Sequence, residues 1–378
     1  MTSTGPLTGL RVLEMAAIGP VPFAGMMLAD YGAEVIRVDR PGTPAALPGT
    51  TPGVDVLGRG KRSMVVDLKH PKGAEIVLEM AGWADVLLEG LRPGVMERLG
   101  VGPDDCARVN ERLIYGRMTG YGQQGPWAAE AGHDITYIAL SGVLGRMGRA
   151  GQPPTPPLNL VGDFGGGALF LVTGVLAALH ERERSGRGQL VDAAMVDGSA
   201  LLTAGMFGAR TPPRRGAGLL DGGAPFYDTF ETADGRYLAA GPIEPQFWTS
   251  FVTGLGLDAA TLDQADQDGW PALKEQIAAI IRTRPRDEWV EHFAGTDACV
   301  APVLEPAELV GHPHHQARDA FVEVDGVAQP APAPRWSRSV PPTPAGAPRR
   351  GDHTDDALAA AGCDPERVAA WRSSGALG

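Results

Sequence analysis

Short apolar runs alternate with helical patterns along the first third of the chain. The apolar runs predict five buried strands, at residues 10–16, 34–39, 63–68, 85–90 and 113–120. The segment AGMMLADYG after the first run and the segment PKGAEIVLEMAGWA after the third have the apolar spacing of helices. Strands that alternate with helices form βαβ units, so the pattern predicts an α/β domain with a mainly parallel sheet.

The turn after the first predicted strand lacks the dinucleotide-binding motif G-x-G-x-x-G. It contains Gly19 and Gly25, but Pro20 and Pro22 stand where backbone N–H groups would receive a pyrophosphate. Asp39 does end the second strand, where dinucleotide-binding folds place a ribose-binding carboxylate. The pattern favours a Rossmann-like domain without this fingerprint, and NAD binding is a minor alternative.

The second half of the chain predicts a smaller domain of mixed structure. Residues 167–202 have the pattern of a long helix, a basic glycine-containing turn and a second helical stretch. A hairpin is expected at residues 227–241, around Asp234-Gly235, and helices near 246–255 and 270–295. We expect a large domain of residues 1–190 completed by 331–378, a linker at 191–226 and a small α+β domain at 227–325.

Composition and charge narrow the classes of protein. The 378 residues are 43% hydrophobic and 21% charged, with a net charge of −12, which argues against a general nucleic-acid binder. Cys106, Cys299 and Cys363 are far apart and form no disulfide framework, so a reducing, cytoplasmic location is expected. We expect neither a signal peptide nor a membrane span, because the apolar stretches contain Gly and fall short of about 18 residues.

Four residues are candidates for chemistry: His133, Asp134, Asp163 and Glu244. Each also has a purely structural explanation. His133 and Asp134 begin a predicted helix, whose first turn Asp134 could cap; Asp163 could cap the long helix, and Glu244 could be a solvated loop carboxylate. A histidine with two carboxylates suits two-base proton transfer at a carbon acid, in which one group removes a proton and another supplies one from the opposite face.

Other catalytic motifs are weak or absent. The run HPHH, with His312, His314 and His315, lacks a carboxylate partner pattern, and no metal site is expected. The chain has no G-x-S-x-G motif, and GRGKRS at residues 58–63 lacks the spacing of a P-loop. The basic residues of GRGKRS are expected in a solvated turn, with a phosphate contact as the alternative.

Longer segments carry a family resemblance over essentially the whole chain, in order. GPLTGLRVLEMAAIGPVPFAGMMLADYGAEVIRVDRPG, ADVLLEGLRPGVMERLGVGPDD, GRGQLVDAAMVDG and YDTFETADGRY resemble the family III CoA-transferase superfamily. Within it, AGHDITYIALSG, PPLNLVGDFGGGALFL, LDGGAPFYDT and IEPQFW are most similar to the α-methylacyl-CoA racemase branch, whose members act in lipid metabolism.

The resemblance implies an interlocked homodimer and a cofactor-independent isomerase. His133 and Asp163 would come from the large domain of one subunit and Glu244 from the small domain of the other. His133 and Asp163 would face opposite sides of C2 of a 2-methylacyl-CoA, and Glu244 would orient the imidazole. The backbone N–H of Asp134 would bind the enolate oxygen, and Gly165, Gly166 and Gly167 would leave room for the thioester.

The same resemblance implies where CoA binds, as part of the substrate rather than as a separate cofactor. Arg40 would approach the nucleotide phosphate, and Arg92 and Arg98 would be further basic contacts. The backbone from Val66 to Lys69 would hold the adenine, and Ile18 would also line the site. An acidic protein needs such a local basic pocket for a polyphosphate.

Two other functions compete with the racemase. A CoA transferase would use Asp163 as the nucleophile that forms an aspartyl anhydride, and it has no need of His133 and Glu244 together. A non-catalytic acyl-CoA binding protein would keep only the arginines. Racemases of this branch tend to have a methionine-rich surface for the acyl chain, whereas this chain offers Met195 and Met206, so the pattern leaves the acyl group open.

Overall fold

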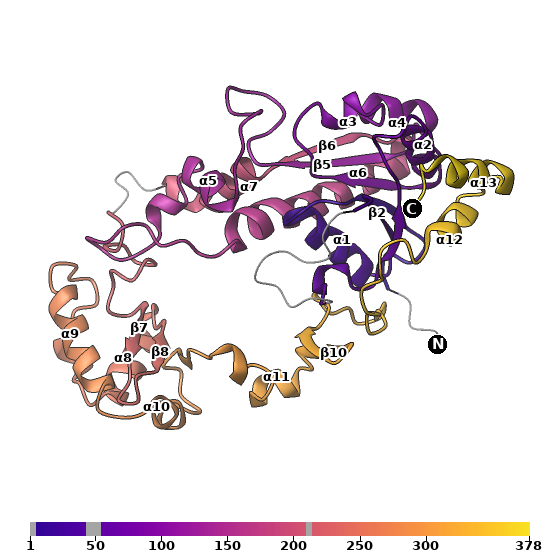
Figure 1. The fold of residues 1–378 in the computed structure, drawn as a ribbon. Coiled ribbons are helices and arrows are strands. Elements are labelled where there is room, and N and C mark those ends of the chain that lie inside the picture. The colour runs from indigo at the N-terminus through magenta and orange to yellow at the C-terminus, as the bar shows by residue number, and fades with distance from the viewer. Residues whose placement is uncertain (1–4, 43–53, 209–213) are drawn as a thin grey trace. The chain divides into compact units, whose positions relative to one another are not determined.

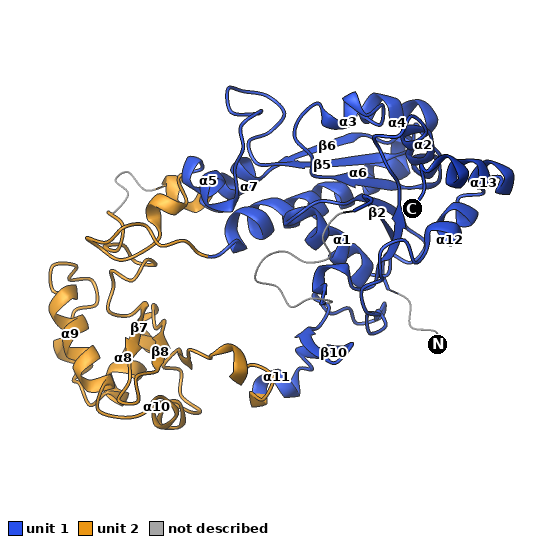
Figure 2. Ribbon diagram, viewed as in Figure 1, with its two compact units in different colours: residues 1–141, 158–203, 314–378 blue, residues 142–157, 204–313 orange. Residues whose placement is uncertain are grey.

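The computed structural model describes residues 5–42, 54–208 and 214–378, which belong to two compact units. Unit 1 comprises residues 1–141, 158–203 and 314–378, and unit 2 comprises residues 142–157 and 204–313 (Figures 1 and 2). The C-terminal segment therefore returns to the unit that the N-terminal segment begins.

Unit 1 is built on a six-stranded parallel sheet with the order β3-β2-β1-β4-β5-β6. This is the strand order of doubly wound nucleotide-binding folds. The first five strands confirm the predicted apolar runs, and the α/β class with a parallel sheet is confirmed with them. The six strands are β1 (Arg11–Met15), β2 (Glu34–Asp39), β3 (Arg62–Val65), β4 (Val86–Glu89), β5 (Ile114–Thr119) and β6 (Leu190–Ala194).

Both faces of this sheet are covered by helices, as a parallel sheet requires. Leu13 joins a core with Met80, Leu358 and Trp371, whereas the next residue back, Val12, joins a second core on the opposite face. The first core is packed by α2 (Gly73–Trp83), α4 (Pro103–Val109), α12 (Thr354–Ala360) and α13 (Pro365–Ser374). The second is packed by α1 (Pro20–Asp30) and α6 (Leu169–Ser185), and the short helix α3 (Val95–Arg98) follows β4.

Two details of unit 1 differ from the prediction. Helix α1 begins at Pro20, earlier than expected, because prolines are tolerated in a first turn whose N–H groups have no intrahelical acceptor. The stretch after the basic turn, predicted to be helical and to pass into a linker at residue 191, begins with β6 and continues as α7 (Met195–Leu202). A short apolar run such as this one cannot be assigned to helix or strand by periodicity alone.

One continuous helical segment is long and apolar enough, by length and composition, to cross a membrane. It runs from Leu160 to Ser185 and joins a π-helix (Leu160–Ala168) to α6. Its longest run without a charged or histidine side chain, residues 164–179, still falls short of about 18 residues, so the expectation of no membrane span is not contradicted. The segment packs as a core helix of unit 1, with Leu171 and Val175 fully buried beneath the sheet.

Unit 2 has a three-stranded antiparallel sheet, β7 (Asp228–Glu231), β8 (Tyr237–Ala240) and β9 (Val300–Pro302), which confirms the hairpin around Asp234-Gly235. Its helices are α8 (Pro245–Gly254), α9 (Trp270–Ile281) and α10 (Arg286–His292). The helix expected at 270–295 is two helices, because Pro285 disfavours helical backbone at the residue before it. Helix α11 (Pro313–Ala317) leads back to unit 1 and the hairpin β10 (Phe321–Val324) and β11 (Val327–Pro330).

Within the residues that the structure describes, five 3₁₀ turns connect these elements. They lie at Val56–Gly58, Leu144–Arg146, Ala204–Gly208, Ala259–Thr261 and Pro306–Glu308.

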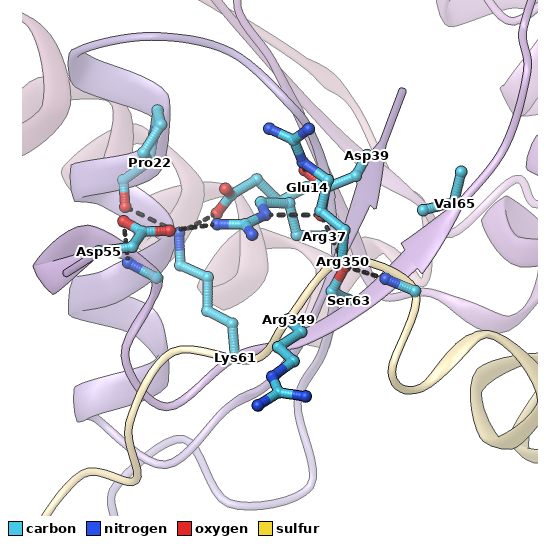
Figure 3. A network of polar contacts seen from close by, with 12 residues as sticks. Glu14, Pro22, Arg37, Asp39, Asp55, Lys61, Ser63, Val65, Arg349 and Arg350 are labelled. Carbon is cyan, nitrogen blue, oxygen red and sulfur yellow. Dashed lines mark hydrogen bonds and ion pairs between the residues drawn. The ribbon is translucent and has the colours of Figure 1, made fainter. Parts of the chain in front are cut away.

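The basic residues of GRGKRS are structural. Lys61 and Glu14 are both fully buried, and the Lys61 Nζ donates to Glu14 Oε2 at 2.6 Å and to the Pro22 carbonyl at 2.9 Å (Figure 3). Arg59 is buried in an ion pair with Asp30, with a closest N–O distance of 2.6 Å. Arg59 and Lys61 therefore lie in no solvated turn and are not available to a phosphate, whereas Arg62, the third cation of the run, is half-buried and pairs with Glu34 Oε1 at 2.7 Å.

Asp39, the candidate ribose ligand of the NAD alternative, belongs to the same polar network (Figure 3). Its Oδ2 accepts hydrogen bonds from the Ser63 hydroxyl at 2.6 Å and from Arg37 Nε at 3.0 Å. The Ser63 contact joins β2 to β3, and the Arg37 contact lies within β2. Asp39 therefore has a structural role that requires no ribose.

The buried pair generates a stability prediction. Lys61→Met leaves Glu14 buried without its cation, and we expect a loss of about 3–5 kcal/mol, typical of breaking a buried ion pair. Burial raises the pKa of Glu14, so the destabilisation should shrink as the pH falls and the carboxyl takes up a proton. Thermal unfolding between neutral and acid pH measures both effects.

The double variant Glu14→Gln/Lys61→Met is the matched control, because it removes the charge of both partners. Its melting temperature should recover much of the loss seen in the single variant. Equal losses in the single and double variants would show that the Lys61 contacts other than Glu14 carry the stability.

Candidate active site

His133 stands at the N-cap of α5 (Asp134–Leu140), in unit 1. The Thr136 side chain pins its backbone, because the Thr136 hydroxyl accepts the His133 N–H at 3.1 Å and donates to the His133 carbonyl at 2.8 Å. The His133 side chain is exposed and caps nothing in the described part of the chain. The local sequence thus fixes the residue through its main chain and leaves the imidazole available for a ligand.

Asp163 lies in the π-helix, a rare conformation that often marks functional sites. It is the fourth residue of that helix, which runs on into α6, so it does not cap the long helix as its structural explanation required. One carboxylate oxygen accepts the Asn159 side-chain amide at 3.2 Å. The Asp163 side chain is half-buried, beside the first residues of α1.

Burial raises the pKa of Asp163, and its neighbours adjust this shift in both directions. The hydrogen bond from Asn159 lowers it, the negative charge of Asp134 raises it, and the charge of His133 lowers it. Asp163 and His133 are therefore close enough to interact electrostatically. A carboxyl with a raised pKa beside an imidazole is a plausible acid–base pair for proton transfer near neutral pH.

The Asp134 carboxylate does not cap its own helix. It is buried, and its Oδ2 accepts the backbone N–H of Asp163 at 2.7 Å. The expected capping role of this side chain is thus wrong, because the acceptor is used to join α5 to the π-helix.

The glycines after Asp163 make room for another helix. A Cβ at Gly166 would lie 2.5 Å from the Ser199 nitrogen of α7, and one at Gly167 would lie 2.9 Å from Met195 Cγ. Both residues are buried. The expectation that Gly166 and Gly167 leave space for a thioester is wrong at these two positions, which instead allow α7 to approach.

The residues expected to bind CoA all follow the carboxyl ends of the parallel strands. Ile18 follows β1, Arg40 follows β2, Val66 and Lys69 follow β3, and Arg92 and Arg98 follow β4. A small cavity opens at this edge, where ligands of doubly wound folds bind. It is lined by Met15, Ala16, Val38, Asp39, Arg40, Val66, Leu68 and Leu91. Ile18, Lys69, Arg92 and Arg98 are partly or fully exposed at their positions, and their roles stay predictions.

Glu244 lies in unit 2, at the N-cap of α8. Its side chain is exposed and makes no capping hydrogen bond within the residues that the structure describes. Its negative charge helps to raise the pKa of Cys299, after the larger effect of burial. Its expected action on His133 stays a prediction.

Two residues near the candidate site escaped the sequence analysis. Asn159 lies four residues before Asp163, and its side chain donates a hydrogen bond to the Asp163 carboxylate. The sequence did not indicate a helix there, because prolines precede Asn159 and favour a loop. Tyr137 packs its ring against Gly120 and Gly132, and burial, followed by the charges of its neighbours, raises its pKa to about 12. The residues described include no cluster of three or more His, Cys, Asp or Glu side chains suited to a metal ion.

The chain is similar to known proteins over most of its length. A family model described as CoA-transferase family III matches residues 7–354. The chain is 45% identical over 373 residues to the alpha-methylacyl-CoA racemase of Mus musculus, with 96% of this chain and 95% of that protein covered.

A transferase and a solved structure are also similar. The chain is 31% identical over 385 residues to the succinyl-CoA–L-malate CoA-transferase beta subunit of Chloroflexus aurantiacus, covering 94% of each. The crystal structure of a CAIB/BAIF family protein from Brucella suis matches with a TM-score of 0.83 and 25% identity, over 95% of this chain and all (100%) of that one.

The contact between α1 and Asp163 generates a prediction. Gly19 has a φ of 76°, and a Cβ there would lie 2.9 Å from Asp163 Oδ2. Gly19→Ala should therefore displace the carboxylate, and we expect any reaction that uses the Asp163 carboxyl to fall roughly 10²-fold in rate. Steady-state kinetics and a thermal melt separate this loss from unfolding.

Gly9→Ala is the matched control. Gly9 also has a positive φ, of 91°, but a Cβ there meets no atom of the described chain within 4 Å. This variant should carry the backbone strain without the loss of activity. Equal losses in the two variants would attribute the effect to strain rather than to Asp163.

Proposed function

The chain belongs to the CoA-transferase family III, and on that premise we propose that it is an α-methylacyl-CoA racemase or epimerase. The observation that carries the proposal is that His133, at the start of α5, lies within electrostatic range of Asp163 in the π-helix. The imidazole is exposed on a pinned backbone, and the pKa of the neighbouring carboxyl is raised, chiefly by burial. The similarity to a racemase over nearly the whole chain supports the same reaction.

In the proposed reaction the substrate is a 2-methylacyl-CoA whose C2 proton is weakly acidic. His133 removes this proton from one face while the thioester carbonyl takes the charge as an enolate. Asp163 then delivers its proton to the opposite face, which inverts C2. For the other epimer the two residues exchange roles, so one must rest as a base and the other as an acid.

The enolate oxygen needs a hydrogen-bond donor that is already in place. The N–H of Asp134 belongs to the first residue of α5, where helical N–H groups have no intrahelical acceptor. We assign it this role, and losing such a donor typically costs about 10²–10³ in rate. The CoA nucleotide would lie along the carboxyl ends of the strands, with Arg40, Arg92 and Arg98 near its phosphates.

The proposal includes a homodimer that completes the site. Six large apolar side chains are exposed on α5, the π-helix, α6 and α7: Ile135, Leu140, Leu160, Leu169, Leu201 and Leu202. Apolar surface of this kind marks a protein contact more often than free solvent. A second copy would cover it and bring its own Glu244 to orient the imidazole of His133.

The experiment that tests the function is isotope exchange with a single epimer of 2-methyldecanoyl-CoA in D₂O, without an acceptor acid. Proton NMR follows loss of the C2 proton, and chiral analysis follows inversion. The wild-type protein should show both, and His133→Ala should lose about 10²–10⁴ in exchange rate, the usual contribution of a proton-transfer group.

The same preparations discriminate the transferase. A free carboxylic acid is added, and CoA transfer is measured. Transfer without exchange in the wild type, retained in His133→Ala, would make Asp163 a nucleophile and overturn the racemase. Asp163→Ala disables both reactions and serves only as the inactive control.

A further inference from the structure

The Asp134 side chain has an environment that a surface helix start does not require. It is only 6% exposed, and one oxygen, Oδ2, accepts the Asp163 N–H at 2.7 Å. The other, Oδ1, is buried without a hydrogen-bond partner in the described ranges. Those ranges also contain no ion pair to this carboxylate, so nothing there neutralises its charge. Burying a carboxylate without a counter-ion costs free energy. This cost indicates that the Asp134 side chain has a functional role.

The contact is enforced by the neighbouring backbone. A Cβ at Gly162 would lie 2.5 Å from Asp134 Oδ2, so the residue before Asp163 must be small for the carboxylate to reach the π-helix. Asp134 also directly follows His133. The hydrogen bond therefore sets the distance between the main chains of the two residues proposed to transfer protons.

The charge of Asp134 acts on Asp163 from the same position. The groups that face Asp163 are His133 and Tyr137, also from α5 or its N-cap, and the neutral Asn159 from its own helix. On the side of α1, the neighbours are Gly19 and Phe23, whose ring stacks on Phe164. Neither residue carries a charge that could act on Asp163. Arg92 interacts with Tyr137. Asp134 is the negative charge among them that favours the neutral form of Asp163.

We propose that the Asp134 carboxylate is a positioning residue that fixes the backbone of Asp163 relative to His133 and favours the protonated form of the Asp163 carboxyl. This inference rests on the proposed function, because it matters only if Asp163 transfers a proton. It differs from the role given to the Asp134 N–H, which concerns the enolate oxygen. The side chain acts through Asp163 and touches no substrate atom.

The test is Asp134→Asn, which keeps an oxygen to accept the Asp163 N–H and removes the charge. The pKa of Asp163 should fall, because the raising effect of Asp134 is lost. The acid limb of the kcat/KM profile for exchange then moves to lower pH. At neutral pH fewer molecules hold a neutral Asp163, so kcat/KM should fall roughly tenfold, less than the 10²–10⁴ lost with a proton-transfer group itself.

Both epimers should show the same displacement of the acid limb, because the ratio of their kcat/KM values equals the equilibrium constant of the reaction.

Glu130→Gln is the matched control. It makes the same change of charge at an exposed position shortly before α5, and its profile should coincide with the wild type.

A second readout does not depend on activity. Carbon-13 NMR of aspartate-labelled protein follows the Asp163 carboxyl, which Asp163→Asn identifies, and its titration midpoint should be lower in Asp134→Asn. A uniform loss of activity with an unmoved midpoint would overturn the inference, and so would a variant that fails to fold, since the carboxylate would then serve the fold. A lowered midpoint in a protein without exchange would refute the proposed function and leave the electrostatic coupling standing.

Discussion

The close approach of the π-helix to α5 and α7 is the constraint on which the candidate site depends. A Cβ at Gly198 of α7 would lie 1.9 Å from the Gly166 carbonyl oxygen, so the two helices pass with their backbones almost in contact. Gly162 makes the corresponding approach to Asp134 possible on the side of α5. A π-helix has poorer geometry than an α-helix and persists where packing enforces it. Here that packing joins the backbone of Asp163 to Asp134, the residue after His133.

Two groups of cations in this acidic protein bear on where a phosphate could bind. One is buried and structural, as in Lys61 with Glu14 and Arg117 with Glu89, whose Nε and Oε1 lie 3.1 Å apart. The other is exposed after the carboxyl end of β4, where Arg92 and Arg98 lie. A polyphosphate needs cations that are not already neutralised inside the fold. This division explains why the most conspicuous basic run, GRGKRS, is the one that does not offer a phosphate site.

Much of the fold could be predicted because its signals are local. The first five strands are short and rich in buried apolar residues, as a parallel sheet buried on both faces requires, and the hairpin of unit 2 is marked by Asp234-Gly235. The failures are equally physical. β6 is a short strand whose first residues are exposed or half-buried, so its apolar pattern is too brief to distinguish it from the start of α7. The helix predicted at 270–295 was divided by a single proline, Pro285.

The sequence by itself determined which residue types are available for chemistry and the order of the elements that carry them. His133 at the start of α5 and Asp163 beside a glycine run could be read directly, because helix starts and small residues leave local signals. Only the tertiary structure decided that the Asp134 carboxylate turns away from its own helix to the N–H of Asp163, 29 residues further on. It also decided that Gly166 and Gly167 serve helix packing and that Lys61 is buried. Each of these depends on which distant backbone comes within a few ångströms, and no local pattern encodes that distance.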